Sequence, residues 1–325
     1  MDKRWNEKYP VFISIVCFLI FAVLVAGCTT TISPPATIPP ATTISVQPTT
    51  SASFQTVVSP SVPITAVPSK TTAVAVTSTP SPRYTPSEKT LVVFTAASLK
   101  GASGKLGTAF SAMYPGDTAV FNLDGTQNLK IQVENGAYAD AFISASNAYT
   151  NTLKSEGFFI NSTIKPLTTN YVIVILPASN PGNIKNLADL AKPGVKIAIG
   201  DKTVPVGTAT SAVLANLAKS TYSQDWNKSV YNNVVTYETT EPGVATKVAL
   251  GEVDAGFVYE STYSAAPKDT YSAITIPKDD NYLQTYTIGV MQQTRNSGVA
   301  QEFEDFMLSG VGQQILRDYG FRPVT

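Results

Sequence analysis

From Glu88 to Thr325, short apolar runs rich in Val and Ile alternate with longer amphipathic segments that contain glycine. The apolar runs show no strict alternation of polar and apolar residues, which is typical of parallel strands buried on both faces. Helical segments between such strands predict a doubly wound α/β unit. The predicted strands are 91–96, a strand ending at 121–122, 140–145, 171–177, 196–200, 255–259 and 285–292, and the predicted helices are 99–113, 128–135, 147–156, 184–191, 209–220, 244–250 and 300–319.

The N-terminal segment has the layout of a secretory signal. Residues 11–27 form an uncharged apolar run that follows three basic residues among the first eight. The run ends in the letters VAGC at Cys28, which resemble the cleavage and lipidation site of a lipoprotein. We therefore expect residues 1–28 to be a lipoprotein signal with a lipid on Cys28. Because a run of about 17 residues can also just span a bilayer, an uncleaved helical anchor is the alternative.

Residues 29–87 hold 11 of the 22 prolines of the chain, together with long runs of Thr, Ser, Ala and Val. Neither a helical nor an alternating apolar period survives this proline density. The composition predicts a disordered, extended stalk, rich in polyproline II conformation, between the N-terminal anchor and the α/β unit. With either kind of anchor, the α/β unit is expected at the outer face of the cytoplasmic membrane.

The composition excludes several functional classes. Histidine is absent, which rules out Ser-His-Asp and Cys-His catalysis and removes the commonest zinc ligand. Both cysteines lie within the first 28 residues, so no Cys-rich metal site is possible downstream. Lys+Arg and Asp+Glu number 23 each, which leaves no basic surplus for nucleic acid. The sequence therefore predicts a protein that is not an enzyme and has no resident metal ion or cofactor; for a serine hydrolase acting through Ser98, no S-x-x-K motif places a lysine near that serine.

Hydrogen-bond donors follow several predicted strands at the points where helices begin. In an open α/β sheet these points meet at the ligand-binding edge. Glycine and proline there place backbone N–H groups at helix N-termini, where an anion binds. A capping role for the serine and threonine, and a half-buried position for the tyrosine, remain open alternatives. Neutral donors suit a small, fully ionised oxyanion. The candidate ligand-binding residues are Ser98, Thr126, Val206, Glu241 and Tyr259.

At these residues the chain resembles the periplasmic molybdate-binding proteins of ABC importers. The matching blocks are LVVFTAASL, ENGAYADAFISAS, IAIGDKTVPVGTAT, KVALGEVDAGFVYES and QQILRDYGF, in the order of the family. The resemblance implies the two-lobe periplasmic-binding-protein fold of type II, each lobe a doubly wound, mostly parallel sheet. It places this domain at 88–325, with the first lobe at about 90–168 plus the C-terminal helices and the second at about 169–290. It also assigns ligand contacts to the same five residues.

One position departs from the family pattern. Archaeal relatives have a glutamate at the position of Glu241 and a second carboxylate just before the loop proline, where both bind the metal of the oxyanion directly. Val204 occupies that second position here. The Glu241 carboxylate then has three possibilities: to bind the metal, to bind as the neutral acid, or to point outward. We expect it to point outward, with the backbone amide as the donor.

The resemblance implies a receptor that delivers molybdate or tungstate to an ABC permease in the membrane. It also implies a monomer without a cofactor. Two alternatives remain: a receptor for another oxyanion such as sulfate, and a surface lipoprotein without a ligand.

Overall fold

The computed structural model describes residues 89–324. The predicted signal at 1–28, its lipidation site Cys28 and the predicted stalk at 29–87 lie outside the described residues and stay predictions. Within residues 89–324, none of the helices combines the length and the hydropathy needed to cross a bilayer.

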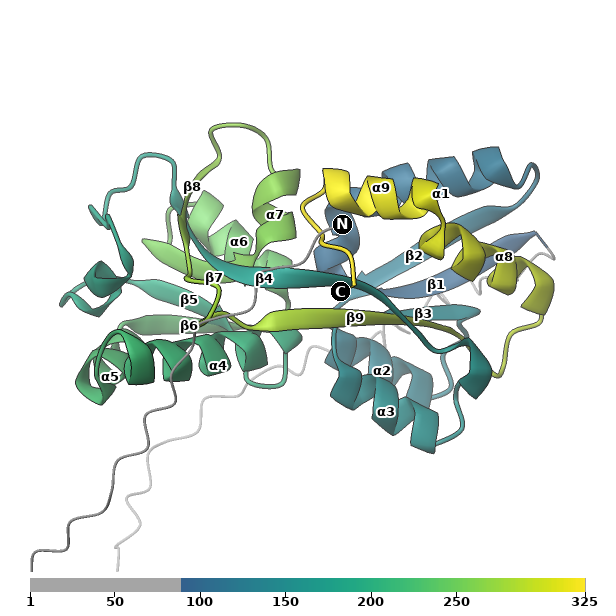
Figure 1. The fold of residues 1–325 in the computed structure, drawn as a ribbon, viewed down its shortest axis with the longest axis horizontal. Helices are drawn as coiled ribbons and strands as arrows, with labels where there is room; N and C mark the ends of the chain where they lie inside the picture. The colour runs from purple at the N-terminus through teal and green to yellow at the C-terminus, as the bar shows by residue number, and fades with distance from the viewer. Residues whose placement is uncertain (1–88, 325) are drawn as a thin grey trace, which may run out of the picture. The chain divides into compact units, whose positions relative to one another are not determined.

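The first lobe is a three-layer α/β arrangement around parallel strands (Figure 1). Strand β1 lies in the middle and pairs in parallel with β2 on one side and β3 on the other. Helices α1, α8 and α9 cover one face of this sheet, and α2 and α3 cover the other. Its elements are β1 (Thr90–Ala96), η1 (Ala97–Leu99), α1 (Lys100–Met113), β2 (Thr118–Asp124), α2 (Thr126–Glu134), β3 (Ala141–Ser144), α3 (Asn147–Ser155), η2 (Asn161–Thr163), α8 (Ser297–Leu308) and α9 (Gly310–Asp318).

The second lobe repeats this plan. Strand β5 pairs in parallel with β6 and β7, and β8 joins the edge through an antiparallel pairing with β4. Helices α4 and α5 cover one face, and α6 covers the other. Its elements are η3 (Leu187–Ala191), β5 (Ile197–Gly200), α4 (Pro205–Ser220), α5 (Gln224–Asn232), β6 (Val234–Glu238), α6 (Glu241–Ala249), β7 (Ala255–Tyr259), α7 (Glu260–Ala265) and β8 (Tyr271–Thr275).

Two long antiparallel strands connect the lobes. Strand β4 (Lys165–Pro177) pairs through its first half with β9 (Leu283–Val290) and through its second half with β7 and β8. Strand β9 also pairs with β3 of the first lobe. The sheet is therefore continuous across the molecule in the order β2-β1-β3-β9-β4-β7-β5-β6.

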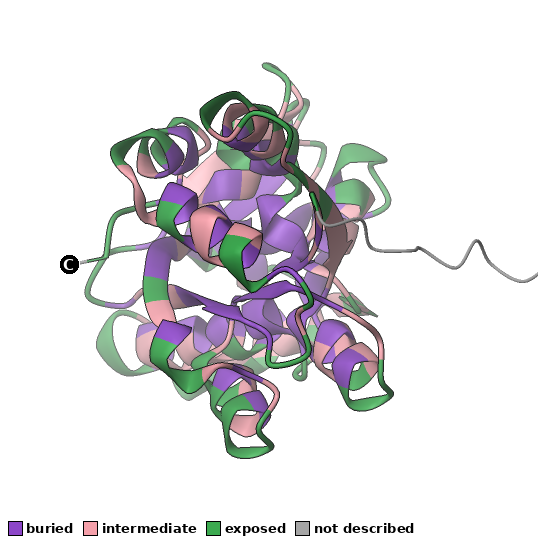
Figure 2. Cartoon of the chain, turned by 90° about the vertical axis from the view of Figure 1, so that its right-hand side faces the viewer, coloured by how far each residue is buried: buried purple, intermediate pink, exposed green. Residues whose placement is uncertain are grey.

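Apolar side chains are buried on both faces of the sheet in each lobe. Figure 2 shows buried strand segments in purple beneath helices that are partly green. On β1, for example, Leu91 and Val93 pack toward α1 and α8, while Phe94 packs toward α2 and α3. The first-lobe core under α1 also contains Phe303 and Phe306 of α8. The second-lobe cores draw only on residues 172–276. Burial on two faces explains why the strands read as continuous apolar runs.

Some elements differ from the sequence prediction. Strands β4 and β9 run antiparallel to their neighbours, whereas β1 to β3 and β5 to β7 are parallel as expected. The single helix predicted at 300–319 is two helices, because Ser309 ends α8 and caps α9 by accepting the N–H of Gly312. The helix predicted at 184–191 is the short 3-10 turn η3. Elements β6, β8, α5 and α7 were not among the predicted ones.

Candidate functional site

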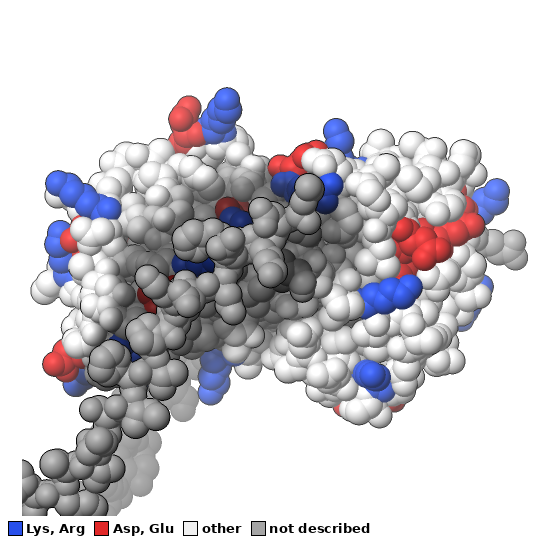
Figure 3. Space-filling model, in the orientation of Figure 1, with Lys and Arg blue, Asp and Glu red and all other residues white. Residues whose placement is uncertain are grey.

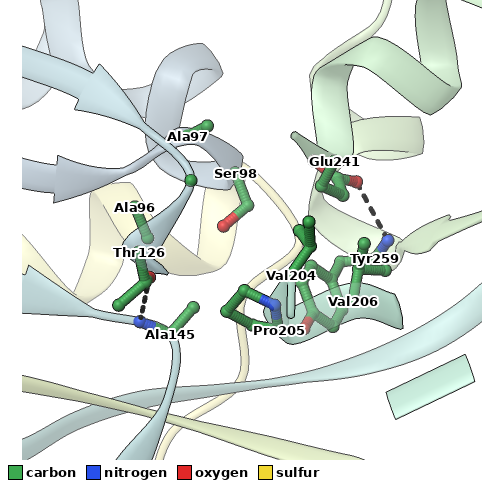
Figure 4. A pocket seen from close by; sticks show the side chains of 11 residues that line it. Ala96, Ala97, Ser98, Thr126, Ala145, Val204, Pro205, Val206, Glu241 and Tyr259 are labelled. Atoms are coloured by element: carbon green, nitrogen blue, oxygen red, sulfur yellow. Dashed lines mark hydrogen bonds between the residues drawn. The ribbon is translucent and has the colours of Figure 1, made fainter. Parts of the chain in front are cut away.

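The five candidate residues come together in one small pocket between the lobes (Figure 4). The cavity has a volume of about 20 Å³, and a single water molecule needs roughly 10–15 Å³. In the form that the structure shows, a cavity of this size fits a compact ligand of a few atoms. The wall consists of Ala96, Ala97, Ser98, Gly125, Thr126 and Ala145 from the first lobe and Val204, Pro205, Val206, Glu241 and Tyr259 from the second.

The wall is made largely of helix beginnings. The 3-10 turn before α1 and the first residues of α2, α4 and α6 all line the pocket. The first N–H groups of a helix have no partner within it, and the helix dipole makes this end positive. The wall residues include no lysine or arginine. The pocket is therefore electropositive through dipoles rather than through ionised cations, as an anion site of neutral donors requires.

Two hydroxyl side chains stand on the first-lobe wall. The Oγ of Ser98 lies 2.8 Å from the Oη of Tyr286, and either atom can donate. The capping interpretation of Ser98 is wrong, because the N-caps of η1 and α1 are Ala96 and Leu99. The Oγ1 of Thr126 accepts the N–H of Ala145 at 3.2 Å, which leaves its own O–H hydrogen to be donated.

The second-lobe wall depends on a tightly folded loop before α4. Pro205 is the first helical residue, so the amide of Val206 is the first N–H that this helix offers. A Cβ at Gly207 would overlap the carbonyl oxygen of Asp201, so only glycine fits there. The Asp201 carboxylate accepts the N–H and the O–H of Thr203 at 2.9 and 2.8 Å, which lowers its pKa. These contacts hold the α4 N-terminus against the pocket.

The carboxylate of Glu241 is turned away from the pocket but remains inside the protein. The residue is 4 % exposed, and its oxygens accept the N–H of Tyr259 at 3.0 Å and the hydroxyl of Thr262 at 2.9 Å. Figure 4 shows it directed toward Tyr259 and away from the first-lobe residues. Burial raises the pKa of Glu241 to about 7, against the opposing effect of the two hydrogen bonds. The Glu241 side chain therefore points away from the pocket, but into the protein interior rather than to solvent.

Val204 is buried and lines the pocket, so the wall has an apolar side chain at this position. Within residues 89–324, His, Cys, Asp and Glu form no group of three or more that could hold a metal ion.

The aromatic side of the pocket contains partners that the sequence interpretation did not identify. The hydroxyl of Tyr259 donates to the Oε1 of Gln284 at 3.1 Å, and burial raises its pKa well above the usual value. The rings of Tyr259 and Tyr286 meet edge to face, with centroids 6.1 Å apart. Tyr286 and Gln284 lie within β9, where the apolar pattern of the strand indicates only core residues. The Ser98 contact to Tyr286 has no signal in the sequence because the two residues are 188 positions apart.

The chain matches the family model described as bacterial extracellular solute-binding protein over residues 91–322. It is 30 % identical to the molybdate-binding protein ModA of Mycobacterium tuberculosis over 72 % of this chain and 84 % of that protein. It is 26 % identical, over 73 % of this chain and 88 % of the relative, to YvgL of Bacillus subtilis, which is named as a candidate substrate-binding lipoprotein of an ABC transporter. Among solved structures, the substrate-binding domain of a candidate molybdenum ABC transporter from Clostridium difficile is 28 % identical with a TM-score of 0.57, covering 73 % of this chain and 99 % of that one. The chain belongs to the bacterial extracellular solute-binding protein family.

Proposed function

We propose that the protein is the extracytoplasmic substrate-binding component of an ABC importer and that it binds molybdate or tungstate between its two lobes. The observation that carries this proposal is the small pocket walled by helix N-termini and hydroxyl groups from both lobes. The molybdate-binding relatives support the same ligand. The family consists of solute-binding proteins rather than enzymes, which confirms the prediction that the chain is not an enzyme.

The chemistry of the pocket favours an anion that only accepts hydrogen bonds. A tetrahedral oxyanion without protons accepts bonds at each oxygen, so neutral donors replace its water shell without a counter-charge. The five proposed contacts are the Ser98 and Thr126 groups of the first lobe and the Val206 amide, the Glu241 amide and the Tyr259 hydroxyl of the second. The Tyr259 hydroxyl would exchange Gln284 for the ligand as its acceptor.

Phosphate differs from these anions because it carries a proton near neutral pH and so needs an acceptor in the site. The acidic group in the wall, Glu241, already accepts bonds from Tyr259 and Thr262 and is directed away from the pocket. We therefore expect phosphate to bind weakly. Sulfate satisfies the charge requirement, but the curated relatives of this chain are named for molybdate rather than for sulfate.

The proposal extends to where the protein works. A lipid on Cys28 and the stalk at 29–87 would hold the binding domain, as a monomer, beside its ABC permease at the outer face of the cytoplasmic membrane. The VAGC letters before the stalk and the lipoprotein name of the Bacillus relative support the lipid anchor. On the face drawn in Figure 3, the visible basic side chains are scattered rather than gathered into one field.

Calorimetric titration of the purified full chain with molybdate, tungstate, sulfate and phosphate tests the proposal. We expect molybdate and tungstate to bind and to raise the melting temperature. At a thousandfold excess over Kd, a ligand that binds only the folded state stabilises it by about 4 kcal/mol. Binding of none of the four anions would overturn the proposed function, and a preference for sulfate would replace its ligand.

A substitution at Thr126 tests whether molybdate binds in this pocket. Thr126→Val removes a hydroxyl donor to a charged group, which contributes about 1.5–3 kcal/mol, so the affinity for molybdate should fall about tenfold or more. Thr163→Val is the matched control, because the Thr163 hydroxyl also accepts a buried backbone N–H, that of Val290 at 2.8 Å, and lies outside the pocket wall. An equal loss of affinity in both variants would show that Thr126 acts through stability alone.

A further inference from the structure

Two side chains of the first lobe donate hydrogen bonds across the cleft to the second lobe. The hydroxyl of Tyr149, on α3, lies 2.7 Å from the carbonyl oxygen of Thr203. The side-chain amide of Gln127, on α2, lies 2.8 Å from the carbonyl oxygen of Thr239. Neither donor lines the pocket, and neither belongs to the proposed ligand contacts.

The two acceptors occupy equivalent places. Thr203 immediately precedes Val204, the N-cap of α4, and Thr239 immediately precedes Thr240, the N-cap of α6. These are the two second-lobe helices whose first residues form the pocket wall. Both donors, in turn, belong to the first turns of their own helices. The cross-lobe bonds therefore fix the helix beginnings of one lobe against those of the other, beside the pocket.

Both donors and the Thr203 acceptor are held in place by further contacts. The side chain of Gln127 folds back over Gly125, where a Cβ would collide with its amide group. The backbone of Tyr149 is fixed by its N–H, which the hydroxyl of the α3 N-cap Ser146 accepts. On the acceptor side, the Asp201 carboxylate holds the loop through Thr203. Donors and acceptors that are ordered beforehand lose little conformational entropy when the bonds form.

We propose that Tyr149 and Gln127 are positioning residues that latch the second lobe over the bound anion, an inference that rests on the proposed function. A bond that joins the two lobes must break before the pocket can open. Because it forms only as the lobes meet, it slows release of the ligand and leaves the first encounter unchanged. A neutral hydrogen bond contributes about 0.5–1.5 kcal/mol, so loss of one should speed release about two- to thirteenfold.

The test uses the full chain with Tyr149→Phe, Gln127→Met and the double substitution. Each protein is loaded with molybdate and then mixed with excess tungstate, and elemental mass spectrometry follows the retained molybdenum to give the dissociation rate constant. Calorimetry gives Kd, and the ratio of the two gives the association rate constant. We expect faster dissociation in each single variant, the fastest in the double variant, and an association rate constant within about twofold of wild type.

The chain offers controls with the same chemistry inside one lobe. The hydroxyl of Tyr271 donates to the carbonyl of Ala245 at 2.9 Å, with both residues in the second lobe. The amide of Gln293 donates to the carbonyl of Ala137 at 2.9 Å, with both residues in the first lobe. Tyr271→Phe and Gln293→Met therefore remove bonds of the same type that do not cross the cleft. Their dissociation rate constants should match that of wild type.

The outcomes separate the two proposals. If the wild-type protein binds molybdate and the cross-lobe variants release it no faster than the controls do, the latch is overturned while the proposed function stands. A slower association with unchanged dissociation would also overturn it, because the residues would then shape the open form. If the wild-type protein binds none of the anions, the proposed function fails first, and the latch fails with it.

Discussion

Glu241 is a buried acid within the wall of a pocket that otherwise consists of neutral groups. Burial raises its pKa from 4.5 to about 7, so the folded state favours the protonated form. This contribution to stability is complete below about pH 4.5 and is lost as the pH rises through about 7. Its full size is about 3 kcal/mol, from 1.36 kcal/mol for each pKa unit.

We therefore expect Glu241→Gln to remove one component of the pH dependence of stability. The amide keeps both contacts, accepting the N–H of Tyr259 and donating to the hydroxyl of Thr262. Urea denaturation of the ligand-free protein between pH 4.5 and 8.5 gives the free energy of unfolding, and the difference between variant and wild type isolates this group from carboxylates such as Asp201, whose lowered pKa acts in the opposite direction. The variant should gain stability relative to wild type as the pH rises. A constant difference across this range would contradict the assignment.

The ionisation of Glu241 should also change the affinity for molybdate. An ionised Glu241 repels a dianion, so the affinity of the wild-type protein for molybdate should fall as the pH rises above about 7, and that of Glu241→Gln should stay level. The tyrosines of the pocket side, Tyr259 and Tyr286, do not titrate in this range, because burial raises the pKa of each of them. Calorimetry at pH 6.5 and 8.5 measures the effect. Equal falls in affinity in both proteins would place the titrating group elsewhere.

Sequence reasoning identified pocket residues that occupy strand ends and helix starts, because chain topology brings such points together. Thr126 and Val206 follow glycine or proline at such points, and the pattern predicts their meeting. The sequence does not predict the roles of Tyr149, Gln127 and Tyr286, because these roles depend on contacts between distant parts of the chain. Nothing in a helix or strand pattern distinguishes a tyrosine that reaches across a cleft from one that packs in a core.

At the scale of elements, the loop before α4 depends on a close approach of backbone to backbone. Gly207→Ala would place a methyl group against the carbonyl oxygen of Asp201 and displace the α4 N-terminus, with its Val206 amide, from the pocket. We expect a loss of stability of about 1–3 kcal/mol, typical of overpacking, together with weaker molybdate binding, measured by urea denaturation and calorimetry.

The control for this substitution is Gly104→Ala in the middle of α1, where a Cβ would have no heavy atom within 4 Å. Alanine there should stabilise the helix by about 0.5–1 kcal/mol and leave binding unchanged. An unaltered stability in Gly207→Ala would show that the loop can shift without cost.

The sequence pattern predicted elements that are long and buried and missed those that are short or partly exposed. Strands β1, β5 and β7 are almost wholly buried, so their apolar runs stand out. In β6, Val235 and Tyr237 are more than half exposed, and the run does not resemble a buried strand. Strand direction has no counterpart in hydropathy, which is why the antiparallel course of β4 and β9 was not predicted. Ser309 divides the C-terminal helices through a cap, a single polar residue within a helical period.

At the scale of the whole molecule, attachment to the membrane depends on the N-terminal segment. Cys28→Ser removes the thiol that a lipid would modify, so the variant should leave the membrane fraction or accumulate as an unprocessed precursor. Fractionation of cells that express each form, with mass spectrometry of the N-terminal peptide, measures this. A variant that stays membrane-bound, beside a wild-type protein with an unmodified Cys28, would favour the uncleaved helical anchor.

The division of the first-lobe core between the two ends of the described chain sets the order in which the protein can be made. Leu91 and Val93 pack with Phe303 and Phe306, which a ribosome adds more than 200 residues later. The second-lobe cores, by contrast, are complete within 172–276. During synthesis the second lobe can therefore fold before α8 has covered the apolar face of β1. A newly made chain thus has an incomplete first-lobe core until Phe303 and Phe306 have been added, and until then the apolar face of β1 lacks its partners from α8.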